Sequence, residues 1–134
     1  MICVDELAVG RQLSRVTHCF RESDVKELGK TVLSDFDRRL AALPEGLCAP
    51  FHEEARQLET ELLFIYRATV LCVRREEDMN EVAGRWKEMV EMCDGCLSRL
   101  QKLTEKHPDC AADIYYDRVL ELRSKCLRLQ EMHQ

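Results

Sequence analysis

The chain has 134 residues, of which 46% are apolar and 34% are charged, with five glycines and three prolines. This length fits one domain with one core, and the composition excludes a disordered or collagen-like chain. Its 25 acidic and 20 basic side chains give a formal net charge of −5, whereas a nucleic-acid-binding protein needs a concentrated basic face. We therefore expect residues 1–134 to form a single domain that does not bind nucleic acid.

Two helices are predicted before the first clear turn. Residues 5–21 carry apolar side chains at roughly helical spacing. Ser23 is a favourable N-cap for a second helix, whose apolar series runs from Val25 to Leu43 at spacings of three and four residues. The second helix must stop before Pro44, because proline disfavours the helical conformation in the residue that precedes it.

The segment 51–106 contains no proline and can be read in two ways. It is either a single helix of roughly 50 residues and about 75 Å, or two helices that turn back on each other near residues 75–78. Asp78 followed by Glu81 forms a capping-box-like start, and helices much beyond ~25 residues are uncommon in compact domains, so we favour the break. The predicted core stripe along this segment is Leu58, Leu62, Ile65, Thr69, Cys72, Glu76, Met79, Ala83, Trp86, Val90, Cys93, Leu97 and Leu100.

A last helix is expected after a second turn at residues 106–109. Asp109 is placed to cap this helix, and Glu121 and Lys125 form an i,i+4 pair on its flank. Its apolar positions are Tyr115, Val119, Leu122, Cys126 and Leu129. Short connections make neighbouring helices antiparallel, so the predicted fold is an all-α, up-and-down bundle of four to five helices.

The eight cysteines are scattered along the chain and make up about 6% of it, below the ~8–10% that is typical of a disulfide scaffold. We therefore expect reduced thiols, most of them acting as small buried apolar side chains. Cys93 and Cys96 form the only CxxC string, which suggests an alternative, a cysteine-based zinc-binding or thiol-redox protein. The string lies inside a predicted helix, which favours burial over a metal site.

Neither a membrane span nor an export signal is indicated. The most apolar stretch, residues 62–73, covers about 18 Å as a helix, which is short of the ~30 Å hydrocarbon core, and Arg67 lies in its middle. The first residues lack the basic and apolar regions of a signal peptide. We therefore expect a cytoplasmic or nuclear protein.

Catalytic motifs are likewise without support. Residues 29–31 resemble the end of a phosphate-binding P-loop but lack its first glycine, and Arg56 replaces the second histidine that a zinc protease helix would need after His52. The sequence contains neither GxSxG nor GxGxxG. We therefore expect a protein that is not an enzyme and has no cofactor. The single tryptophan, Trp86, lies on the core stripe and is predicted to be buried.

The functional prediction rests on the stretch 62–73, which is apolar on nearly every side. Its core stripe is already complete, so further apolar side chains are in excess and would be available to a partner. These candidate partner-binding residues are Leu63, Tyr66, Val70 and Val73. We expect a small adaptor, or a subunit of an intracellular complex, that buries this face against a partner helix. A homo-oligomer or a hetero-oligomer is compatible with this expectation.

Overall fold

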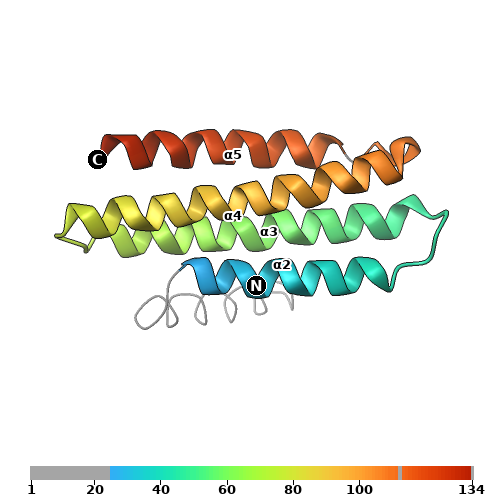
Figure 1. Ribbon diagram of the computed structural model, residues 1–134, viewed down its shortest axis with the longest axis horizontal. Helices are drawn as coiled ribbons and strands as arrows, with labels where there is room; N and C mark the ends of the chain where they lie inside the picture. Colours follow the sequence, from blue (N-terminus) through green and yellow to red (C-terminus); the bar gives the residue numbers. More distant parts are fainter. Residues whose placement is uncertain (1–24, 112, 134) are drawn as a thin grey trace, which may run out of the picture.

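The computed structural model describes residues 25–111 and 113–133 (Figure 1). Within these ranges the chain forms four α-helices and one short 3₁₀ turn, without any strand. The prediction of an all-α chain is therefore confirmed for the described residues. The helix expected over residues 5–21 and the N-cap expected at Ser23 lie outside them.

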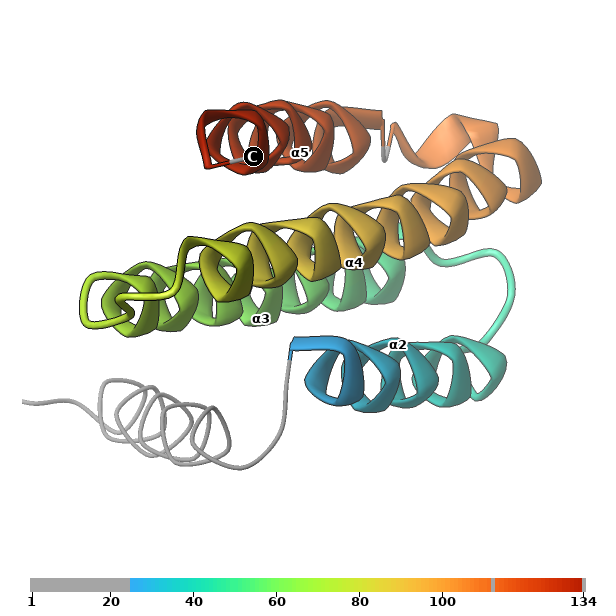
Figure 2. The same ribbon diagram turned by 60° about the vertical axis from the view of Figure 1, so that its left-hand side comes forward.

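The helices are separated at the turns that the sequence predicts. Both views show the described helices lying alongside one another, with α4 next to α3 and to α5 (Figures 1 and 2). The elements are α2 (Val25–Ala41), α3 (Cys48–Val73), α4 (Met79–Lys106), the 3₁₀ turn η1 (Pro108–Cys110) and α5 (Asp113–Met132).

The segment 51–106 is divided between α3 and α4 and is not a single rod. Asp78 caps α4, because its Oδ1 accepts a hydrogen bond from the backbone N–H of Asn80 at 2.9 Å. The backbone N–H of Asp78 donates to Oε1 of Glu76 at 3.2 Å, so Glu76 takes the role that a capping box would give to Glu81. The break favoured from the sequence is confirmed, with its cap at the expected aspartate.

The start of the last helix differs from the prediction. Asp109 lies inside η1 and does not cap α5, which begins four residues later at Asp113. Ala111 follows η1 with a φ of 51°, in the left-handed region, and so separates the two helical elements. The additional turn brings Cys110 against the start of α3.

One hydrophobic core joins the described helices. α3 and α4 each contact the other three described helices, and they contain eight and ten buried residues, respectively. The sequence predicted a central position for residues 62–73 of α3, and the structure gives α4 a central position as well. Trp86 is only 2% exposed, which confirms its predicted burial. Met79 is 47% exposed although it lies on the predicted core stripe, and it is the first residue of α4, directly after the turn.

The spacing between α2 and α4 depends on a missing side chain. A Cβ atom at Gly95 would lie 2.6 Å from Cδ1 of Leu33, whereas at Gly84 it would meet nothing within 4 Å. One turn beyond Gly95, Arg99 binds both carboxylate oxygens of Asp37, at 2.8 and 2.9 Å. Because Gly95 has no side chain, α2 can approach α4 closely at this point. The ion pair between Asp37 and Arg99 holds the same two helices together.

Replacing each of these glycines by alanine should separate helix propensity from packing. Gly84→Ala is expected to raise the free energy of unfolding by about 0.5–1 kcal/mol, because alanine is the better helix former. Gly95→Ala should gain less than Gly84→Ala, because the end of the Leu33 side chain must move away from the added methyl group. Urea denaturation of both variants measures the difference, and equal gains would show that the contact with Leu33 does not restrict the residue at position 95.

Candidate partner-binding surface

The four residues singled out from the sequence lie along one side of α3. Leu63, Tyr66, Val70 and Val73 are separated by three, four and three residues, which keeps them on one helix face. Each is partly buried and packs against the core. We call these four residues the α3 face; its side chains support the core and also reach the surface.

Tyr66 of α3 contacts side chains of both α4 and α5. The centre of its ring lies 5.7 Å from that of Trp86 in α4, and Nζ of Lys125 in α5 lies 5.8 Å from the centre of the Tyr66 ring. Burial, followed by the proximity of Cys126, raises the pKa of Tyr66 above its ordinary value. Lys125 forms no ion pair with Glu121, the partner that the spacing suggested, although the structure describes both residues. Its ammonium group lies over the Tyr66 ring instead, at the distance of a cation–π contact.

Further exposed apolar side chains lie close to the turn between α3 and α4 and at the end of α5. Leu71 and Met79, on the two sides of this turn, are each 47% exposed. Met132, at the end of α5, is 72% exposed. Sequence periodicity did not identify these three residues as surface residues, because a periodic stripe does not show where packing against the neighbouring helices stops.

The geometry of Cys93 and Cys96 does not favour the zinc or thiol alternative. Both side chains are fully buried on α4, which confirms their predicted burial. The hydrogen bond between Cys93 and Cys126 raises the pKa of Cys93 and lowers that of Cys126, while burial raises the pKa of Cys96 to about 12. A thiolate is the form that attacks a disulfide, so the raised pKa values of the buried Cys93 and Cys96 argue against the thiol-redox role. Among the described residues, no group of three or more His, Cys, Asp or Glu side chains could hold a metal ion.

The expectation of reduced thiols is wrong for one pair of cysteines. Cys48, the first residue of α3, forms a disulfide with Cys110 of η1, with their Cα atoms 5.1 Å apart. The imidazole Nε2 of His52, one helical turn after Cys48, also lies 2.5 Å from the backbone carbonyl oxygen of Cys110. The pairing could not be read from the sequence, since it depends on the additional turn that places Cys110 beside α3.

Comparisons of the chain with protein-family models, with curated proteins and with solved structures all find no match. Among the described helices, none is both long and apolar enough to cross a membrane. The function therefore has to be argued from the surface and the contacts of this chain alone.

Proposed function

We propose that this protein is a non-enzymatic interaction module, an antiparallel up-and-down helical bundle that binds an amphipathic helix of a partner protein through the α3 face. The observation that carries the proposal is that four apolar side chains on one side of α3 remain partly exposed although the core is complete without them. At the end of the bundle where α3 turns into α4, Leu71 and Met79 are also exposed. Apolar side chains gathered in this way are typical of surfaces that another protein covers.

The charges around the α3 face indicate what kind of helix would fit. Arg67 and Arg74 are exposed and lie four residues after Leu63 and Val70, on the same side of α3. Within the described part of the chain, neither guanidinium group has an ion-pair partner. Lys125 adds a third positive charge over Tyr66. A partner helix with an apolar stripe flanked by acidic residues would complement this arrangement.

The proposal is tested by placing negative charge on the α3 face. In the variant with Val70→Glu and Val73→Glu, binding to the partner should weaken by at least about tenfold, because carboxylates would be buried against an apolar and acidic helix. The tagged chain and the variant are recovered from native cells, and mass spectrometry identifies the proteins retained by each. Leu120→Glu on α5 is the matched control, since it places the same charge at an exposed apolar position outside the α3 face.

The expected result is a protein retained near one-to-one by the unmodified chain and by Leu120→Glu, and lost by the double variant at unchanged helicity. Retention by the double variant would contradict a role of the α3 face in binding, and loss of helicity would show that Val70 and Val73 are needed for the fold. Recovery of the unmodified chain alone would contradict the proposal as a whole. We also propose that the protein acts in the cytoplasm or nucleus. Disulfides are rare in these compartments, so the recovery is made both with and without reductant.

A further inference from the structure

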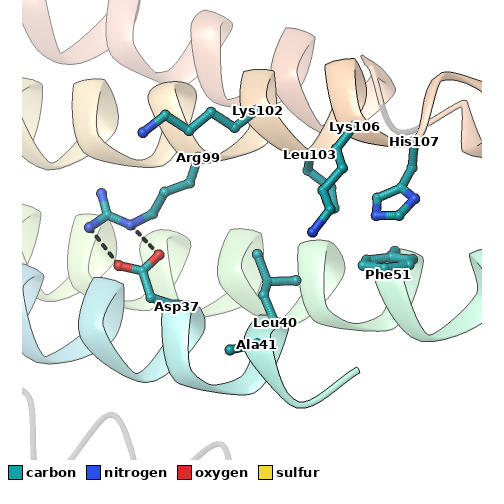
Figure 3. A pocket seen from close by; sticks show the side chains of 9 residues that line it. All are labelled: Asp37, Leu40, Ala41, Phe51, Arg99, Lys102, Leu103, Lys106 and His107. Atoms are coloured by element: carbon teal, nitrogen blue, oxygen red, sulfur yellow. Dashed lines mark hydrogen bonds and ion pairs between the residues drawn. The ribbon is translucent and has the colours of Figure 1, made fainter. Parts of the chain in front are cut away.

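A second surface feature lies at the other end of the helices from the α3–α4 turn. A cavity of about 190 Å³ opens between the last turn of α2, the first turns of α3 and the last turns of α4 (Figure 3). This volume is below that of drug-sized sites, so the cavity suits a small ligand. None of the residues of the α3 face lines this cavity.

The inner part of the cavity is apolar. Leu40 of α2, Phe51 of α3 and Leu103 of α4 line it, and both Phe51 and Leu103 are only 5% exposed. These three side chains come from three helices and leave a recess where they meet (Figure 3). An alkyl or aromatic group placed there would remove further apolar surface from water.

The rim of the cavity is positively charged, although the whole chain is acidic. Arg99, Lys102 and Lys106 line it together with one carboxylate, Asp37, which is already bound by Arg99. Lys102 and Lys106 are exposed and form no ion pair with any described residue. In Figure 3 the Lys106 side chain extends across the opening toward Leu40. One uncompensated positive charge, that of Lys106, therefore lies over the opening, whereas the Lys102 side chain extends away from Phe51 and His107 (Figure 3).

His107 supplies an unsatisfied polar group at the same place. Its ring lies against Phe51, with 4.1 Å between the ring centres, and its Nε2 is buried without a hydrogen-bond partner. Buried polar atoms in proteins are nearly always hydrogen-bonded, so the absence of a partner for this nitrogen requires an explanation. Favourable interactions with the negative ends of α2 and α4 could account for the lysines alone. These helix-end interactions explain neither the apolar recess beneath the lysines nor the missing hydrogen-bond partner of the His107 Nε2 atom.

We infer that this cavity binds a small amphipathic carboxylate, with its alkyl or aromatic body on Phe51, Leu40 and Leu103 and its carboxylate on Lys106 and His107. Charge-assisted hydrogen bonds from an ammonium group to a carboxylate are among the strong ones, and the Nε2–H tautomer of His107 would donate a second bond. The apolar body distinguishes this ligand class from inorganic phosphate. The inference does not depend on the α3 face, because the two features share no residue.

The test titrates the full-length chain with sodium benzoate and follows the backbone amide signals by NMR. Benzoate should produce saturable shifts at millimolar concentration, centred on Phe51, Lys106 and His107. Benzyl alcohol, which has the ring without the charge, and sodium phosphate, which has the charge without the ring, should produce neither saturation nor this pattern. In Lys106→Gln, benzoate binding should weaken by about tenfold, since one charge-assisted hydrogen bond is removed.

Lys87→Gln is the matched control, because Lys87 is an exposed lysine of the same helix that does not line the cavity. It should bind benzoate as the unmodified chain does. Absence of saturable shifts, equal shifts with benzyl alcohol, or equal weakening in both lysine variants would each overturn the inference. Lys102→Gln provides a second rim variant, for which a smaller weakening in the same direction is expected.

Discussion

Removal of the Cys48–Cys110 disulfide is expected to lower the free energy of unfolding by about 4 kcal/mol. The two cysteines are 62 residues apart in the sequence, so the bridge excludes many conformations from the unfolded chain. In the chain-entropy treatment, the stabilisation grows with the logarithm of the loop length and reaches about 4 kcal/mol for a loop of this size. Urea denaturation followed by circular dichroism would measure the loss in the variant with Cys48→Ala and Cys110→Ala.

Cys72→Ala is the control for this experiment, since Cys72 is a free and partly exposed cysteine of the same helix. It should change the free energy of unfolding little, and adding reductant to the unmodified chain should reproduce most of the loss seen in the double variant. If the double variant and Cys72→Ala unfold at the same urea concentration, the bridge does not contribute to stability.

Trp86→Ala is expected to cost about 3–5 kcal/mol, because it removes the largest fully buried side chain of the described core. Trp86 is 2% exposed, and its ring contacts that of Tyr66, so truncation leaves a cavity where α3 and α4 meet. A loss of this size is a large share of the 5–15 kcal/mol, roughly, that stabilises a typical domain. Circular dichroism is the suitable probe, because this variant has no tryptophan to report by fluorescence.

Trp86→Phe separates packing from the polar part of the indole. The indole Nε1 is buried without a hydrogen-bond partner, so its removal relieves an unfavourable burial while most of the ring contact remains. We expect Trp86→Phe to cost about 1–2 kcal/mol, well below the cost of Trp86→Ala. Equal losses in the two variants would indicate that the indole nitrogen makes an essential contact.

The sequence predicted the elements that depend on local chemistry. Pro44 and Gly46 marked the turn after α2, and the short polar side chain of Asp78 was sufficient to locate the start of α4. The prediction failed where two residues were equally suitable as the start of a helix. Both Asp109 and Asp113 can begin a helix, and the choice between them depends on a 3₁₀ turn that no periodic pattern indicates.

The two candidate sites differ in how far the sequence could predict them. The α3 face follows from the excess of apolar residues on one helix, so local periodicity was sufficient to propose it. The cavity brings together Leu40, Phe51 and His107, which are far apart in the sequence and belong to different elements. Each of these residues has an ordinary local context, and only the contacts between helices make the arrangement visible.

The position of the disulfide connects it thermodynamically with the cavity. Cys48 lies three residues before Phe51, and Cys110 lies three residues after His107, so the bridge holds together the two elements that carry these rings. If a carboxylate binds more tightly to the disulfide-bonded form than to the reduced form, the bound carboxylate must make the disulfide harder to reduce. Thermodynamic linkage makes the two effects equal in size. The ratio of thiols to disulfides around the protein would then determine how much carboxylate it holds.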